Sequence, residues 1–232
     1  MKVMAREGAW ASTYFRTAIN HCIEADKLLA SIRSTNDLSQ HIAIDERMNE
    51  AGAITIVFSA MCIEAYINDY LAQSMGEETF YKHHERNSST DKLNLVLGSD
   101  NLHGKDKVES AAKALFKERN DMVHAKSRDI SYESAADDDQ TQPSNITHDS
   151  TISTYWLDYC TDYANRANRA ICAVLLIGEY MQRKEPSFRT DVFLLGLNAI
   201  PMLPLDIINK ITELCSELGI SLPIMPEYRP TT

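Results

Sequence analysis

The stretch ITIVFSAMCIEAYI, residues 54–67, is apolar on every side of an ideal helix. A surface helix keeps one polar face, so a helix without one is expected at the centre of a domain, enclosed by others. The stretch belongs to a predicted helix that runs from about residue 45 to residue 75, and Gly76 is expected to cap its C-terminal end. This central helix is the feature around which the rest of the chain has to fold.

Three further long helices are predicted where apolar residues recur every three or four positions. They cover residues 8–33, 105–126 and 151–183. Gly and Pro are scarce in the first 180 residues, which favours long helices, and no segment alternates as a strand does. The predicted fold is therefore all-α, an up-and-down bundle of four long helices with short helices and a C-terminal helical extension.

The segments between the long helices have signals of their own. Residues 78–90 are expected to form an irregular connector, and Ser88 with Asp91 resembles a capping box that starts a short helix ending at Gly98. Residues 127–150 are acidic, rich in Ser and Thr and without an apolar period, which predicts a mobile loop.

Two parts of the chain are predicted from this pattern. Residues 1–187 would form the helical bundle, and residues 188–232 would form a C-terminal extension. The extension contains an apolar stripe at helical spacing over residues 205–218, which Gly219 ends. That helix is expected to pack either on its own bundle or on a partner subunit.

Composition limits the possible functions. The formal net charge of −10 makes a general nucleic-acid binder improbable, so any contact with nucleic acid requires a local basic patch. The five scattered cysteines form no C-x-x-C pair, which favours reduced thiols over a disulfide frame or a zinc site. We expect no metal, no cofactor, no secretory signal and no membrane-spanning segment, and therefore a soluble protein of the cytoplasm.

The sequence FKERNDMVHAK, residues 116–126, concentrates polar chemistry within a predicted amphipathic helix. On an ideal helix, Lys113, Lys117, Asn120 and His124 share one stripe. Arg119 lies about 140° away from His124, among the apolar positions of the helix. A guanidinium in that position needs an acceptor, so we expect it to lie against an acidic side chain from another helix.

Glu64 is the only charged residue of the apolar stretch and needs a partner in turn. Pairing Glu64 with Arg119 satisfies both groups. Two interpretations follow from such a pair. It either locks two helices together, with His124 as an ordinary surface histidine, or it supports a site built from Arg119 and His124.

The pattern R-N-D-M-V-H, from Arg119 to His124, resembles the R-x-x-x-x-H signature of the HEPN superfamily of helical domains. The apolar, glutamate-bearing segment 58–69 before the motif helix adds to the resemblance, which covers roughly residues 45–185. Many HEPN-like proteins are metal-independent endoribonucleases of the toxin or defence type. The resemblance therefore implies that Arg119 and His124 are catalytic, with Asn120 and Asp121 orienting them.

In that chemistry an RNA 2′-hydroxyl attacks the adjacent phosphate. A histidine can serve as the general acid or base, and an arginine can stabilise the charge that builds on the phosphorane oxygens. Between residues 103 and 128 there are seven Lys or Arg and four Asp or Glu, a local excess of three positive charges. We expect this basic strip to bind RNA through four cations: Lys113, Lys117, Lys126 and Arg128.

Toxin members of the family act with a neutralising protein, so the resemblance implies an antitoxin partner. One toxin subgroup carries a modified tyrosine two residues after the histidine, where this chain has Lys126, so the resemblance does not extend to that modification. The 140° offset favours a homodimer around the motif helix, in which Arg119 and His124 of both copies line one cleft. The alternatives are a non-catalytic dimerisation or regulatory module and, with no Gly-rich cradle to support it, a nucleotide-binding protein.

Overall fold

The computed structural model describes residues 10–35, 37–98, 102–124, 148–186 and 203–220. Every secondary-structure element within these ranges is a helix, so the predicted all-α class is confirmed. The helices are α1 (Trp10–Ile32), α2 (Leu38–Met75), α3 (Glu77–His83), α4 (Ser89–Leu97), α5 (Lys105–Val123), α6 (His148–Lys184) and α8 (Leu205–Leu218).

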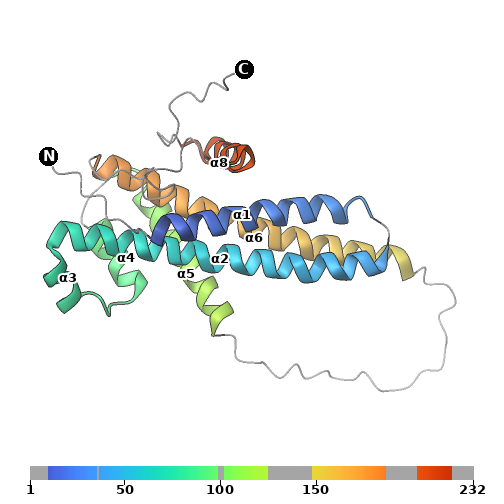
Figure 1. Cartoon of the computed structure of the whole chain (residues 1–232), viewed down its shortest axis with the longest axis horizontal. Coiled ribbons are helices and arrows are strands. Elements are labelled where there is room, and N and C mark those ends of the chain that lie inside the picture. Colours follow the sequence, from blue (N-terminus) through green and yellow to red (C-terminus); the bar gives the residue numbers. More distant parts are fainter. Residues whose placement is uncertain (1–9, 36, 99–101, 125–147, 187–202, 221–232) are drawn as a thin grey trace.

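Helix α2 is the centre of the molecule. It packs against α1, α3, α4, α5 and α6 (Figure 1), as expected for its apolar sequence. It begins two turns earlier than the predicted residue 45, because Asp37 is an N-cap whose side chain accepts a hydrogen bond from the Ser39 backbone at 2.9 Å. His41 is buried in this first part and its Nε2 lies 2.9 Å from the Thr35 carbonyl oxygen.

The connector predicted over residues 78–90 is wrong for its first part, because Glu77–His83 forms the helix α3. Gly76 separates α2 from α3 with a φ of 88°, a value that L-residues with a side chain rarely adopt. The start of α4 is confirmed, since the Ser88 hydroxyl accepts a hydrogen bond from the Asp91 backbone, and Gly98 ends the helix.

The boundaries of the remaining long helices differ slightly from the predictions. Helix α5 ends at Val123, and α6 begins at His148, so the last three residues of the predicted loop 127–150 are helical. The other residues of that loop, and most of the extension around α8, lie outside the described residues. Helix α8 has the bounds that its apolar stripe predicts.

Helices α1, α2 and α6 run along the long axis of the molecule, whereas α5 crosses them obliquely (Figure 1). Helices α2 and α6 approach closely at Gly52, where an added Cβ would lie only 2.9 Å from Cδ1 of Tyr163. The glycine therefore leaves room for the tyrosine ring, and next to it the Tyr159 hydroxyl donates to Asn49 Oδ1 at 3.0 Å.

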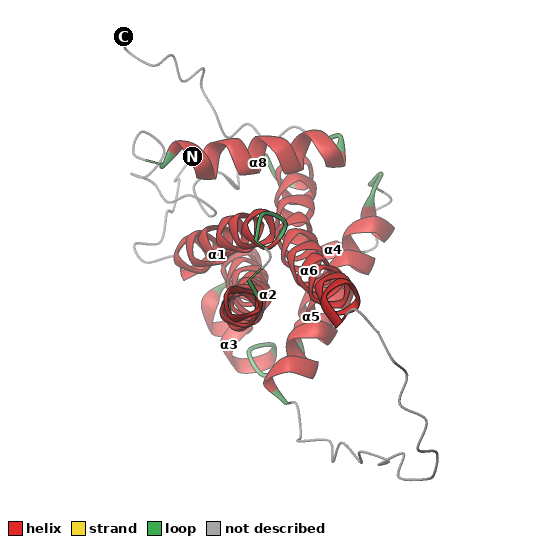
Figure 2. Cartoon of the chain, turned by 90° about the vertical axis from the view of Figure 1, so that its right-hand side faces the viewer, coloured by secondary structure: helices red, strands yellow, loops and turns green. Residues whose placement is uncertain are grey.

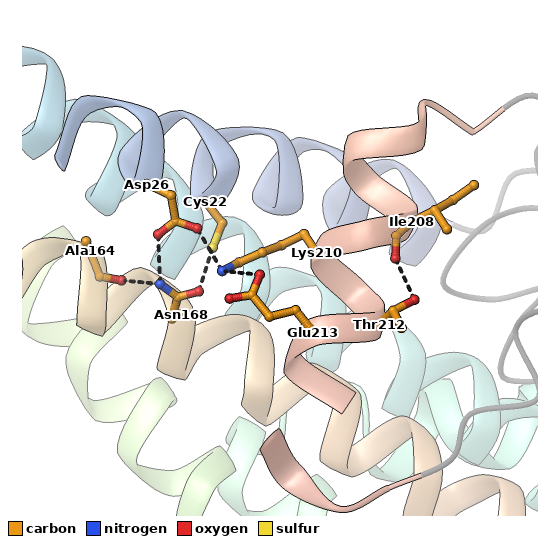
Figure 3. A network of polar contacts seen from close by, with 8 residues as sticks. All are labelled: Cys22, Asp26, Ala164, Asn168, Ile208, Lys210, Thr212 and Glu213. Atoms are coloured by element: carbon orange, nitrogen blue, oxygen red, sulfur yellow. Dashed lines mark hydrogen bonds and ion pairs between the residues drawn. The ribbon is translucent and has the colours of Figure 1, made fainter. Parts of the chain in front are cut away.

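Helix α8 packs on α1 and α6 of its own chain. Ile207, Ile211 and Leu214 are buried in this contact, together with Lys210. Figure 3 shows the polar network at its centre: Lys210 Nζ lies 2.7 Å from Asp26 Oδ2 on α1, and Asn168 of α6 donates to Asp26 Oδ1 at 3.0 Å.

Helix α2 is long and apolar enough to cross a membrane by length and composition, and within the described ranges it alone meets that test. The most apolar window of the helix is, however, 56% buried by the rest of the chain. A central helix of a bundle has this same character, so α2 is weak evidence for a membrane span.

Candidate functional site

The motif residues occupy the last turns of α5. Arg119 is half-buried, whereas Asn120 and Asp121 are exposed. His124 is the C-cap residue, with φ −107° and ψ 17°, and its backbone N–H still donates to the Asn120 carbonyl at 2.9 Å. The imidazole of His124 is therefore exposed at the end of the helix, on backbone that the helix still fixes.

The predicted ion pair between Glu64 and Arg119 is present. Nη2 of Arg119 lies 2.7 Å from Oε1 of Glu64, which joins α5 to the middle of α2. The two side chains are 20% and 26% exposed, so the pair is half-buried rather than fully enclosed. Charge-assisted hydrogen bonds of this kind fix the direction of a guanidinium, and Arg119 consequently points toward α2.

Two residues of α4 complete the surroundings of Glu64. The Ser89 hydroxyl donates to the same Oε1 that accepts from Arg119. Lys92 is buried, its ammonium lies 5.7 Å from the centre of the Phe80 ring, and burial lowers its pKa while the charges of Glu64 and Glu85 oppose that shift. Sequence reasoning missed Ser89 and Lys92, because only the packing of α4 against α2 and α5 brings them here.

Arg119 is incompletely satisfied. Its Nε is buried and has no hydrogen-bond partner within the part of the chain that the structure describes. Buried donors are usually paired, and an unpaired one commonly marks a site under functional constraint or a bridging water. The arginine thus retains one unused donor beside its contact with Glu64.

One cation of the basic strip is paired with an acidic side chain of the same helix. The Lys113 ammonium pairs with Glu109 one turn earlier, and this hydrogen bond lowers the pKa of the Glu109 carboxyl. Glu118 pairs with Arg166 of α6, whose guanidinium also lies 5.0 Å from the centre of the Tyr163 ring. Lys117 is exposed.

The other two cations assigned to RNA binding, Lys126 and Arg128, lie outside the described residues.

Arg119 and His124 are not brought together within one chain. The arginine reaches α2, no hydrogen bond joins the two side chains within the described structure, and the histidine faces solvent at the helix end. The separation follows from the helical offset of about 140° between the two positions. A site that uses both groups on one phosphate therefore needs a substrate that bridges them or a second copy of the chain.

Within the part of the chain that the structure describes, the motif residues line neither a cluster of metal ligands nor the pocket between α1, α2 and α8. Within the described residues, no three His, Cys, Asp or Glu side chains lie together as metal ligands would. A pocket of about 400 Å³ opens elsewhere, between α1, the start of α2 and the start of α8, and none of the motif residues lines it. Two ion pairs cross it, Arg47 with Glu24 at 2.7 Å and Lys27 with Asp206 at 3.5 Å.

A comparison with protein-family models found none that matches the chain, and searches of curated proteins and of solved structures found no significant similarity.

Proposed function

We propose that the protein is a metal-independent endoribonuclease of the HEPN toxin or defence type that acts in the cytoplasm. In this proposal residues 1–187 are the HEPN-like unit, with its four long helices as an up-and-down bundle. His124 is the general acid or base and Arg119 stabilises the phosphorane. Asn120 and Asp121 orient these groups, and the cations at positions 113, 117, 126 and 128 bind the phosphate backbone of the RNA.

One observation carries the proposal: the motif arginine is held from outside its own helix while the motif histidine is free. Glu64 and Ser89 meet at Oε1 of the carboxylate that binds Arg119, so the guanidinium is preorganised. His124 is exposed on a helix-fixed backbone and can reach a substrate. A preorganised positive charge and an accessible imidazole, brought to one phosphate by a second copy or by the substrate, suit cleavage in which the 2′-hydroxyl of the RNA is the nucleophile.

The reaction needs no external nucleophile. The 2′-oxygen forms a bond to the adjacent phosphorus while the bond from phosphorus to the 5′-oxygen of the next nucleotide breaks. A base removes the proton of the 2′-hydroxyl, and an acid gives a proton to the leaving 5′-oxygen. The products are a 2′,3′-cyclic phosphate and a 5′-hydroxyl. DNA lacks the 2′-hydroxyl that attacks the phosphorus, so a DNA strand cannot be a substrate.

Further proteins belong to the proposal. A homodimer would bring Arg119 and His124 of two copies to one RNA strand, which compensates for their separation in one chain. A toxin of this type would also have an antitoxin as a neutralising partner.

A non-catalytic dimerisation or regulatory module is the second candidate, and one observation favours it. Arg119 already has a carboxylate partner, and Glu109 neutralises Lys113 on the same helix. A motif whose charges are satisfied internally can serve as a structural joint between α2 and α5 without binding a phosphate.

The deciding experiment is cleavage of single-stranded RNA in the presence of a chelator. The wild type is expected to cut RNA but not the matching DNA strand. His124→Ala should lower the rate by about 10²–10⁴-fold, the usual contribution of a general acid or base. His83→Ala, an exposed histidine on α3, is the matched control and should leave the rate unchanged. A wild type that cuts no RNA, or a His124→Ala variant that cuts as fast, favours the non-catalytic module.

A further inference from the structure

Glu64 is a single carboxylate that is stabilised by two cations. Arg119 binds it at 2.7 Å, and the charge of Lys92 on α4 acts on it as well. Lys92 is 9% exposed, and within the part of the chain that the structure describes its ammonium has no hydrogen bond or ion pair. It lies 5.7 Å from the centre of the Phe80 ring. Lysines are rarely buried without a partner, so the position of this cation calls for a reason beyond packing.

Helix α4 directs Ser89 and Lys92 to the same side. The two residues are three positions apart, so they share one face of the helix, and α4 packs on both α2 and α5. Figure 2 shows α4 next to α5 on one side of the bundle. Ser89 is the first residue of α4 and donates to Glu64 Oε1, so the carboxylate also benefits from the partial positive charge of the helix N-terminus. Glu64 is thus supported by groups other than Arg119.

Arg119 is the group that can use this support. Its Nη2 binds Glu64, whereas its buried Nε has no hydrogen-bond partner within the described residues. In the proposed reaction the guanidinium also has to bind a phosphate, and its five N–H donors allow it to hold two anions. Sharing the guanidinium weakens its hold on Glu64, however, and a half-buried carboxylate that loses its counter-charge is costly.

We propose that Lys92 is a positioning residue of the proposed reaction, which keeps Glu64 compensated while Arg119 binds the phosphate. The inference rests on the proposed function, because it assigns a role within the same site. Arg119 and Lys92 carry two positive charges against the one negative charge of Glu64, and the remaining charge matches that of one phosphodiester. Glu85 also acts on Lys92, but it is exposed, where water and salt screen its charge.

The first test measures kcat and KM for the cleavage of single-stranded RNA. Lys92→Met keeps most of the length of the side chain and removes the charge. We expect kcat to fall about tenfold, because the phosphate draws most on Arg119 when charge builds on the phosphorane, and KM to change by less than about threefold. Ser89→Ala removes the other support of Glu64 and should also lower kcat. It decides the question if circular dichroism shows that Lys92→Met does not fold.

Repeating the substitution in a Glu64→Gln background separates positioning from a merely structural role. A neutral amide needs no counter-charge, so Lys92→Met should there change kcat by less than about twofold. If Lys92 only supports the packing of α4, its removal lowers kcat equally in both backgrounds. Lys82→Met is the matched control, because Lys82 is exposed on α3, and it should leave kcat unchanged.

The second test measures binding without cleavage. A single-stranded RNA with 2′-O-methyl groups has no free 2′-hydroxyl and cannot be cut, and fluorescence anisotropy gives its dissociation constant. We expect Arg119→Met and Lys92→Met each to raise this constant at least about threefold, and Lys82→Met to leave it unchanged.

The two tests distinguish failure of the inference from failure of the proposed function. A wild type that cuts no RNA but binds the strand through Arg119 and Lys92 refutes the nuclease and supports the positioning role of Lys92. A Lys92→Met variant that cuts and binds as the wild type does overturns the inference and leaves the nuclease standing, as do equal losses in the two Glu64 backgrounds. A wild type that neither cuts nor binds RNA overturns both.

Discussion

At the scale of single residues, Glu64 is the side chain on which most of the candidate site depends. It is the one charge in the apolar stretch of α2, and it accepts hydrogen bonds from Ser89 and Arg119, which come from two other helices. A carboxylate in such surroundings is tolerated because its acceptors are used. Removing it leaves the half-buried guanidinium of Arg119 without its partner, which is costlier than removing both groups together.

A double-mutant cycle between Glu64 and Arg119 tests this dependence. Glu64→Gln keeps the shape and one acceptor for Ser89 but removes the charge, and Arg119→Met keeps much of the length of the side chain. We expect each single change to lower the free energy of unfolding by about 1–3 kcal/mol. The coupling energy should be about 1–2 kcal/mol, measured by urea unfolding at pH 7. Additive effects, with coupling below about 0.3 kcal/mol, would mean that the two side chains do not stabilise each other.

At the scale of elements, the attachment of α8 combines an apolar face with a buried cation. Lys210 is 8% exposed and lies against Asp26, while Glu213 of α8 itself lies 3.4 Å away. Burial alone would lower the pKa of Lys210, but the hydrogen bond and the charge of Asp26 outweigh burial and raise the pKa above its ordinary value of 10.5. The lysine therefore stays charged in the folded protein at every physiological pH.

Lys210→Met tests this attachment through its pH dependence. The variant should lower the stability of the protein at pH 7 by about 1–3 kcal/mol, since Asp26 loses a charged partner while keeping Asn168. The pKa of Lys210 is raised on folding, so its contribution is fully present below pH 10.5 and is lost as the pH rises through the folded-state value. The difference in stability between wild type and variant should thus be constant from pH 7 to pH 10 and shrink above it. A difference that already shrinks between pH 7 and pH 9 would contradict the raised pKa.

At the scale of the whole molecule, the distribution of charge separates two kinds of contact. The formal net charge of −10 opposes both self-association and the approach of RNA. Self-association through an uncharged surface, as in the proposed homodimer, would meet only the long-range repulsion of the two copies. The proposed RNA binding would instead depend on direct contacts between lysines and phosphates, which salt weakens by competing for the phosphates.

Salt should therefore act in opposite directions on the two contacts. Raising NaCl from about 20 mM to about 500 mM shortens the screening length several-fold and reduces the repulsion between copies. We expect the homodimer to become tighter, so that its dissociation constant, followed by sedimentation, falls. The His124→Ala variant should bind a single-stranded RNA more weakly, which fluorescence anisotropy measures. A dimer that dissociates as salt rises would point to an interface held by ion pairs instead of apolar contacts.

The sequence by itself determined the helical class, the central position of α2 and the Glu64–Arg119 pair. The first two have signatures in the local sequence, whereas the pair joins two residues 55 positions apart that each need a partner. An apolar helix has to be enclosed by other helices, and two opposite charges in apolar surroundings are stable only when they pair. Ser88 and Gly98 likewise mark the ends of α4 in the sequence. Short helices were less predictable, as α3 shows, because seven residues give too short a pattern to distinguish a helix from a loop.

Only the tertiary structure decided what surrounds these features. Ser89 and Lys92 lie near Glu64 because α4 packs on α2. Glu118 pairs with Arg166 of α6, which is 48 residues away in the sequence. The polar network that holds α8 likewise depends on contacts between distant segments, since Lys210 pairs with Asp26 of α1. Local sequence specifies which side of a helix is apolar, but the helix that covers that side is chosen by the packing of the whole chain.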